Sequence, residues 1–167
     1  MNFRSRLVLV AAPILLVGAS ATAGSSSSDI KTDPMSFFEG RTESVSTVKL
    51  IMKKPYQSKT IGEGEIKDGV LHLVQRVYEE GKPPTERRWR MRQVGPGRFS
   101  GTMSEAKGPV TADEVNGRYR FRLKLKSNIS VEQWLTPMPG GKSAQSKLTI
   151  RKFGMVVGRS EGTIRKQ

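Results

Sequence analysis

The side chains with catalytic potential are few in this sequence. His72 is the only histidine, and the chain contains no cysteine. A multi-histidine metal site, a thiol nucleophile and disulfide bonds are therefore excluded. His72 has apolar neighbours on both sides, Leu71 and Leu73, so we interpret it as a structural histidine within a strand. We find no phosphate-binding or dinucleotide-binding glycine loop, and we expect no serine in the nucleophile elbow of a hydrolase.

Paired carboxylates are the remaining catalytic candidates, because two acids on one surface can hydrolyse a glycosidic bond. Glu63 and Glu65 share one face of a strand with Ile61, so one interpretation points both acids into the protein interior. We favour the interpretation that this is a solvated strand face. An enzyme that acts on envelope lipids or sugars through these two acids is therefore the last-ranked of three functional hypotheses. We therefore predict no metal, no cofactor and no enzymatic activity.

The most regular feature of the chain is an alternation of basic and apolar residues in segment 118–126. In a strand, such an alternation places the two kinds of side chain on opposite faces. The apolar residues are Tyr119, Phe121, Leu123 and Leu125. The cations are Arg118, Arg120, Arg122, Lys124 and Lys126. Single-stranded nucleic acid is held where aromatic and basic groups share one surface, so we do not expect a nucleic-acid partner.

Arg87 departs from this separation of basic and apolar residues. It shares a strand face with Trp89 and Met91. Two interpretations stay open: a buried cation that meets a carboxylate inside a barrel, or a strand end where the chain leaves the sheet.

The first residues have the composition of a signal peptide. Arg4 and Arg6 precede an apolar run at 7–17, and small residues follow at 19–23. The run is shorter than the roughly 20 residues that a membrane span needs, so we expect cleavage, after Ala21 or Ala23. We assign residues 1–23 to the signal peptide, 24–36 to a flexible lead-in and 37–167 to one domain. With no cysteine for a lipid anchor, we predict a soluble periplasmic protein.

Turn-forming residues recur through the domain at the spacing of an all-β protein. Asp68-Gly69 and Asn116-Gly117 are the strongest hairpin signals, because both favour the positive φ angles of type I′ turns. Between the turns, apolar residues recur with period two. The strands predicted in this way cover residues 42–52, 57–67, 70–79, 86–93, 97–104, 110–115, 118–126, 129–136, 146–153 and 155–165. We predict an all-β, antiparallel up-and-down β-barrel of roughly nine or ten strands, with a two-sheet sandwich as the alternative.

A barrel of this kind is lined by the apolar faces of its strands. The residues that we expect to line a ligand site are Leu71, Leu73, Trp89, Met91, Phe99, Met103, Tyr119, Phe121 and Leu123, and Val77, Leu148 and Ile150 share the same faces. They form either a packed core or the wall of a pocket, and both interpretations stay open.

Several short motifs along the domain resemble an uncharacterised bacterial envelope family, domain of unknown function 3833. The motifs are Phe38-Glu39-Gly40, Glu86-Arg87-Arg88-Trp89-Arg90, Gly97-Arg98-Phe99-Ser100-Gly101, Asn116-Gly117-Arg118-Tyr119, Glu132-Gln133-Trp134 and Lys152-Phe153-Gly154-Met155-Val156-Val157-Gly158. The resemblance implies a lipocalin-like barrel in a proteobacterial envelope and no assigned activity. Many relatives look like lipoproteins, whereas this chain lacks the anchoring cysteine, which favours a soluble periplasmic form.

Two functions compete for this domain. The first is a monomeric barrel that binds a lipid or other small amphiphile in the bacterial envelope. The second is a non-catalytic structural or adhesion module, whose basic exterior associates with an anionic membrane surface or lipopolysaccharide. The net charge of +14 supports an anionic partner of this kind, and the five cations from Arg118 to Lys126 are the candidate contacts.

Overall fold

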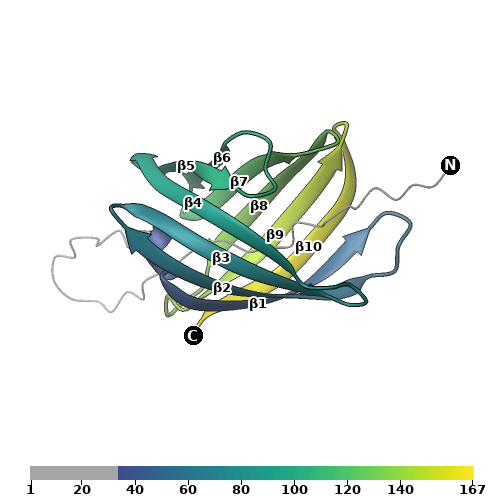
Figure 1. Cartoon of the computed structure of the whole chain (residues 1–167), viewed down its shortest axis with the longest axis horizontal. Coiled ribbons are helices and arrows are strands. Elements are labelled where there is room, and N and C mark those ends of the chain that lie inside the picture. Colours follow the sequence, from purple (N-terminus) through teal and green to yellow (C-terminus); the bar gives the residue numbers. More distant parts are fainter. Residues whose placement is uncertain (1–33) are drawn as a thin grey trace.

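The computed structural model describes residues 34–167 of the chain. The predicted signal peptide, its cleavage sites and most of the predicted lead-in lie outside the described residues. The described part is an antiparallel barrel whose strands follow one another around the wall (Figure 1). Each strand pairs with the next along the chain, and β1 pairs with β10 to close the sheet. The predicted up-and-down barrel is therefore confirmed, and the sandwich alternative is wrong.

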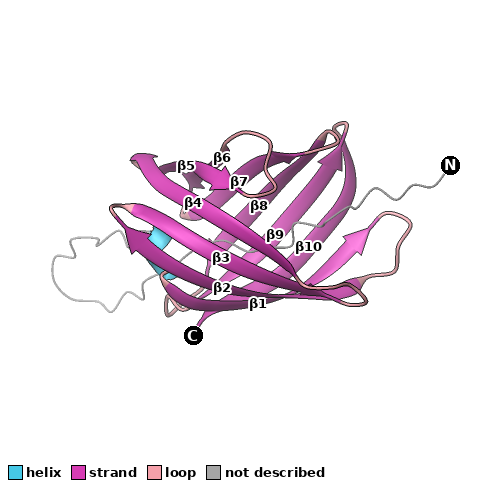
Figure 2. Cartoon of the chain, viewed as in Figure 1, coloured by secondary structure: helices cyan, strands magenta, loops and turns pink. Residues whose placement is uncertain are grey.

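The ten strands match the predicted segments to within about three residues at each end. They are β1 (Gly40–Leu50), β2 (Tyr56–Lys67), β3 (Val70–Glu79), β4 (Thr85–Gly95), β5 (Arg98–Met103), β6 (Val110–Val115), β7 (Arg118–Leu125), β8 (Ile129–Pro137), β9 (Ser143–Lys152) and β10 (Met155–Lys166). Figure 2 shows short loops joining most of them. Asp68 and Asn116 both have φ of 52°, and the glycine after each is also positive, as predicted for hairpin turns.

The barrel has two chemically different ends. One end holds the 3-10 helix η1 (Pro34–Phe37), which precedes β1, and we call it the η1 end. The other holds the β1–β2, β3–β4, β5–β6, β7–β8 and β9–β10 connections, and we call it the far end. In Figure 1, η1 lies at the left of the barrel and the β9–β10 connection at the upper right.

The helix η1 closes its end of the barrel with apolar side chains. Met35, Phe37 and Phe38 are buried and belong to the main hydrophobic cluster. The Lys166 side chain near the chain's other end donates a hydrogen bond of 2.6 Å to the carbonyl oxygen of Ser36. Residues 34–36, which the sequence predicts as lead-in, therefore form η1, and Met35 is part of the core. The composition of this short segment gives no helical periodicity from which to predict it.

Candidate functional site

The apolar residues predicted to line a ligand site all face the barrel interior. Each of the nine is at least 95% buried, and all belong to one hydrophobic cluster with Leu148 and Ile150. They come from β3, β4, β5 and β7, and β6 lies between β5 and β7 in the same part of the wall. Their role in binding a ligand stays a prediction.

The opposite part of the wall is lined by small polar side chains, which the sequence analysis did not anticipate. The buried hydroxyl residues of this polar wall are Thr42, Ser44, Ser46, Ser58, Thr60, Ser146 and Ser160. They lie on β1, β2, β9 and β10, which are adjacent in the barrel. The interior is therefore amphipathic, with an apolar side and a hydroxyl-bearing side. The sequence did contain a signal for this polar wall, because Thr42, Ser44 and Ser46 alternate with period two. A search for apolar strand faces does not detect it.

Two hydroxyl groups on this polar wall are buried without a hydrogen-bond partner. They are the Oγ atoms of Ser44 and Ser58. The two residues lie on paired strands, since Ser44 is opposite Thr60 and Ser58 is opposite Ser46. Buried hydroxyls in folded proteins nearly always have a partner, so two neighbouring exceptions mark a place where a polar group is expected.

Buried amides connect the polar and apolar parts of the interior. The Trp89 indole nitrogen donates a hydrogen bond of 2.8 Å to Oε1 of Gln75. On the other side, the Gln133 amide donates to the Ser146 hydroxyl, also at 2.8 Å. Because both amides are buried and hydrogen-bonded, they hold Trp89 and Ser146 in defined positions along the boundary.

Arg87 is a buried cation inside the barrel, which confirms one of its two interpretations. Its side chain is 0% exposed, and its Nε lies 3.2 Å from Oε2 of Glu105, whose side chain is 29% exposed. Burial lowers the pKa of Arg87, and the carboxylate of Glu105 partly opposes that effect. Nearby, the Tyr56 hydroxyl donates to Glu79, and burial followed by that carboxylate raises the pKa of Tyr56. These four residues form a charged cluster toward the far end.

The predicted cationic face of β7 lies on the outside of the barrel, but neighbouring strands occupy part of it. Asp113 on β6 contacts Arg122 at 2.6 Å and Arg120 at 3.9 Å. The Trp134 ring on β8 lies 4.4 Å from the Arg118 guanidinium and 5.6 Å from that of Arg120. The predicted separation holds within β7, where Tyr119 and Phe121 are buried and the cations face outward. The sequence analysis did not anticipate that the register of β7 and β8 places Trp134 beside Arg120 on the outer surface.

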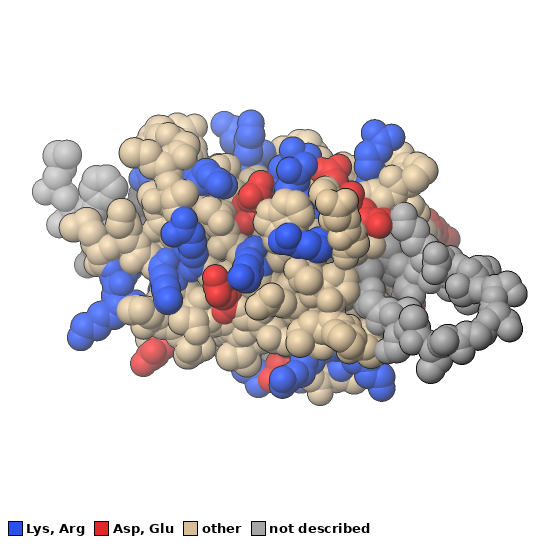
Figure 3. Space-filling model, turned by 180° about the vertical axis from the view of Figure 1, so that it is seen from behind, with Lys and Arg blue, Asp and Glu red and all other residues tan. Residues whose placement is uncertain are grey.

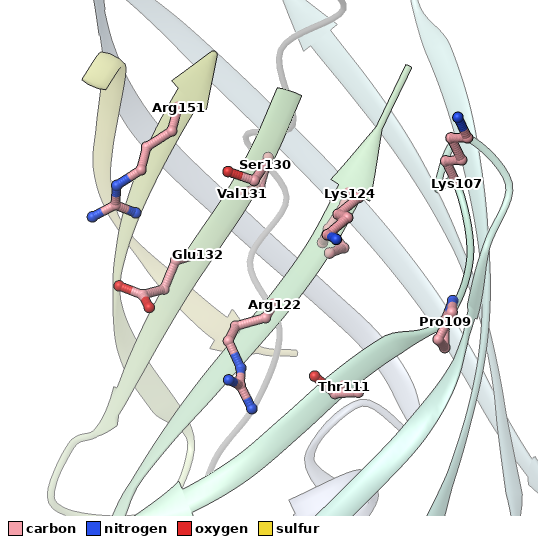
Figure 4. Close-up of a pocket in the computed structure, with 10 residues that line it drawn as sticks. Lys107, Pro109, Thr111, Arg122, Lys124, Ser130, Val131, Glu132 and Arg151 are labelled. Carbon is pink, nitrogen blue, oxygen red and sulfur yellow. The ribbon is translucent and has the colours of Figure 1, made fainter. Parts of the chain in front are cut away.

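A surface pocket of about 580 Å³ lies beside this face (Figure 4). Arg122 and Lys124 on β7 and Arg151 on β9 line it, together with Glu132 on β8 and Lys107 across the pocket. A second pocket of about 890 Å³ shares Lys107, Lys124 and Ser130 with the first and extends to Phe153 and Gly154 at the far end. No acidic residue lines the second pocket. Figure 3 shows the barrel from behind, with basic side chains spread over this face and acidic ones among them.

The catalytic candidates do not assemble into a site. Glu63 and Glu65 are exposed on the outer surface, and Glu63 pairs with Arg41 at 3.4 Å, so the hypothesis of a carboxylate pair inside the barrel is wrong. Gly158-Arg159-Ser160-Glu161-Gly162 does have the Gly-x-Ser-x-Gly spacing, contrary to our expectation. It lies within β10, however, and not at a strand-to-helix turn.

His72 is not placed to act as a base for Ser160. It alternates with the inward-facing Leu71 and Leu73 and therefore points outward, whereas Ser160 faces the interior. Within residues 34–167, no group of three or more His, Asp or Glu side chains is placed to hold a metal ion. The helical part of the same range contains nothing long and apolar enough to cross a membrane.

The model of the family described as protein of unknown function (DUF3833) matches residues 14–166. The chain belongs to this family. The resemblance expected from the sequence motifs is thereby confirmed. Among curated proteins, none matches the chain in sequence at a significant level.

Solved structures with a similar fold include the S-type phycobiliprotein lyase CPES from Guillardia theta. It has a TM-score of 0.64 and 7% sequence identity, with 80% of this chain and 90% of that chain covered. Rv2717c from M. tuberculosis has a TM-score of 0.61 and 11% identity, with 80% and 94% covered.

A protein of unknown function from the DUF3598 family of Nostoc punctiforme has a TM-score of 0.59 and 11% identity. The aligned region covers 80% of this DUF3833 chain and 48% of that chain. At such low identities these three similarities establish the fold, a lipocalin-like barrel, and no shared activity.

Proposed function

We propose that this DUF3833 protein binds a lipid or other small amphiphile inside its barrel and has no catalytic activity. The observation that carries the proposal is the pair of buried hydroxyls, Ser44 and Ser58, which lack partners on the polar wall. An amphiphile has both a polar group to satisfy such hydroxyls and an apolar part to contact the apolar wall. In general, a barrel of ten strands can enclose more space than one of eight, and small side chains such as those of β1, β2 and β10 fill less of it than large ones.

The apolar part of the ligand is expected to lie against the predicted lining residues. Leu71, Leu73 and Trp89 lie on the β3–β4 side of the interior, and Tyr119, Phe121 and Leu123 lie on β7. The polar group is expected near Ser44 and Ser58. The Arg87–Glu105 pair then lies toward the far end, where it limits how apolar a ligand that end accepts.

Native mass spectrometry of gently purified protein tests the proposal directly. We expect a bound species, or uptake of added fatty acid or phospholipid by the bare chain. The Ser44→Ala and Ser58→Ala variants are expected to bind such a ligand about three- to tenfold more weakly per hydroxyl, which corresponds to one hydrogen bond. Thr163→Val removes a hydroxyl from the outward face of β10 and is the matched control, with unchanged affinity.

Stability separates this role from a purely structural one. Removing a buried hydroxyl that has no partner removes an unsatisfied polar atom, so we expect the ligand-free Ser44→Ala protein to be equally or more stable. If Ser44→Ala instead destabilises the ligand-free protein and leaves ligand uptake intact, the hydroxyl serves the fold. A bare chain that takes up no fatty acid or phospholipid would overturn the proposal.

Within this proposal, the protein is exported and acts in the bacterial periplasm as a soluble monomer. Support comes from the composition of residues 4–23 and from the absence of cysteine. Fractionation of a bacterium that expresses the protein with a C-terminal tag checks the location. We expect a product shortened by about 20 residues in the periplasmic fraction. Full-length protein that remains in the cytoplasm would contradict the location without touching ligand binding.

A further inference from the structure

Unusually exposed apolar side chains gather at two turns of the far end. The four most exposed large hydrophobic residues in the described part of the chain are Met52, Met155, Ile51 and Phe153, at 98%, 68%, 66% and 65%. Ile51 and Met52 follow β1, while Phe153 and Met155 flank the turn between β9 and β10. We call these four residues the apolar tips.

The two turns lie side by side, so the apolar tips belong to one surface. The Ile51 backbone nitrogen donates a hydrogen bond of 3.0 Å to the Val157 carbonyl oxygen, which joins the two turns. The Phe153 nitrogen donates at 3.1 Å to the carbonyl oxygen of Asn128, which adds the β7–β8 turn to the same surface.

Backbone geometry indicates that Met52 and Phe153 are not ordinary turn residues. Both have positive φ, 59° for Met52 and 50° for Phe153, and Gly154 follows at 83°. Asparagine or aspartate is strongly preferred at such positions, and the β2–β3 and β6–β7 hairpins of the η1 end follow that preference with Asp68 and Asn116. A strained conformation that keeps a large apolar side chain in water is expected where that side chain has a function.

The chain segments around the apolar tips contain basic residues and no acidic ones. Segments 44–62, 115–131 and 133–160, which include the three turns, contain no aspartate or glutamate. Lys53, Lys54, Lys126 and Lys152 lie within or next to the turns. On the other side of the far end, β3 ends at Glu79, and the β3–β4 connection holds Glu80 together with Lys82, which pairs with Glu79. The side of the far end formed by β1, β2, β7, β8, β9 and β10 is therefore the more basic one.

A basic pocket adjoins the apolar tips. The pocket of about 890 Å³ at this end is lined by Lys107, Lys124, Ser127, Asn128 and Phe153, among others. It offers ammonium, hydroxyl and amide groups beside an apolar tip, which is the chemistry that binds a phosphate-bearing headgroup at a membrane interface.

We propose that the far end docks on an anionic lipid bilayer, with the apolar tips inserted at the interface and the surrounding lysines on the headgroups. Single apolar side chains at turn tips, ringed by long cationic ones, fit a bilayer better than a protein partner, because protein interfaces are depleted of lysine. The side of the far end that carries Glu79 and Glu80 is the less basic one, so we expect the barrel to dock with its axis tilted and its basic side nearer the anionic surface. This surface shares Lys124 and Lys126 with the predicted cationic set but excludes its three arginines, which contact Asp113 or Trp134.

The absence of cysteine from the chain allows a site-specific test. Single-cysteine variants Met52→Cys and Phe153→Cys, labelled with an environment-sensitive dye, are mixed with phosphatidylglycerol–phosphatidylcholine vesicles. We expect a blue shift and an intensity gain at both sites, lost at high salt and absent with pure phosphatidylcholine vesicles. Val94→Cys is the matched control, because Val94 is an exposed apolar residue at the η1 end of β4. The label at Val94 is expected to stay in water.

Vesicle binding of unlabelled variants gives a second measurement. The pair Met52→Ser and Phe153→Asn is expected to lower the vesicle partition coefficient at least about tenfold. Because asparagine suits the positive φ of residue 153 and both side chains are exposed, we expect this double variant to fold as well as the parent, so that lost binding is not lost folding. Lys53→Gln with Lys54→Gln is expected to lower binding more than Lys67→Gln with Lys142→Gln, which removes equal charge at the η1 end.

Three outcomes would overturn the proposal. They are an unshifted label at residues 52 and 153, an equal shift at residue 94, and vesicle binding that survives the paired tip variant. Equal binding to neutral and anionic vesicles would also contradict it. Uptake of soluble fatty acid by the barrel interior does not depend on these variants, so failure of either proposal leaves the other standing.

Discussion

At the scale of single residues, the interior of this barrel depends on a few polar groups in an apolar setting. Arg87 is the extreme case, because it is fully buried and its Nε contacts a carboxylate that water reaches. A buried charge that loses its partner costs far more than a charge that can turn to solvent. The two halves of this pair should therefore respond very differently to substitution.

Glu105→Gln is expected to destabilise the protein by roughly 3 kcal/mol, because it removes a contacting carboxylate from the buried guanidinium. Arg87→Met is expected to cost only about 1 kcal/mol, since Glu105 is left partly in water and methionine fills the apolar space. Urea unfolding of both variants and of the double variant measures the difference and the coupling. A larger loss for Arg87→Met than for Glu105→Gln would contradict this account.

Tyr56 provides a prediction that depends on pH. Burial and the carboxylate of Glu79 raise the pKa of Tyr56 above its ordinary value of 10.0. The folded protein then keeps the phenolic proton where the unfolded chain has lost it, so this contribution to stability is present below pH 10 and falls as pH rises further. Tyr56→Phe is expected to cost about 1 kcal/mol at pH 7, the value of the lost hydrogen bond. The cost should shrink above pH 10, as measured by unfolding across the pH range.

At the scale of elements, the segment that follows η1 packs closely against β2, and Gly64 makes this close approach possible. A Cβ atom at Gly64 on β2 would lie 1.9 Å from the carbonyl oxygen of Phe38. Phe38 belongs to the buried cluster that closes the η1 end, and the atom that would clash is backbone, which has little freedom to move. Glycine at this position is required by the close approach of the N-terminal segment.

Gly64→Ala is therefore expected to destabilise the protein by about 2 kcal/mol or more. Gly62→Ala on the same strand is the matched control. Its Cβ would lie 2.6 Å from Oγ1 of Thr42, a side-chain atom that can rotate away, so we expect a smaller loss. Thermal and urea unfolding compare the two variants. Equal losses would show that η1 does not hold its position against β2.

At the scale of the whole molecule, pairing of β1 with β10 joins the two ends of the described chain. All other neighbouring strands are joined by hairpins, whereas this seam pairs Thr42 with Lys166. Contacts so distant in sequence cost the most chain entropy to form, so we expect the seam to close late in folding.

Two buried isoleucines test this order of events. Ile164 lies on β10 at the seam, and Ile150 lies on β9 within the hairpin-linked part of the sheet. Changing either one to valine is expected to cost about 1 kcal/mol. For Ile164→Val the loss should appear mainly as faster unfolding, and for Ile150→Val it should also slow folding. Stopped-flow kinetics measure both rates, and slower folding of Ile164→Val alone would reverse the proposed order.

The amino-acid sequence by itself determined the local structure of this protein. Period-two alternation in segments such as 118–126 predicted the strands to within about three residues at each end, and Asp68-Gly69 and Asn116-Gly117 predicted two of the hairpins. Side-chain alternation is a property of each strand alone, so the inward-facing set from Leu71 to Leu123 could also be predicted. The single histidine and the missing cysteine restricted the possible chemistry before any fold was known.

Only the tertiary structure decided which side chains from different strands meet. Register placed Trp134 beside Arg120, brought Glu105 to Arg87 and gathered the serines of β1, β2, β9 and β10 into one wall. It also set the β1–β2, β7–β8 and β9–β10 turns side by side at the far end. The physical reason is that a strand's alternation fixes the direction of its side chains, while closure of the barrel fixes their neighbours.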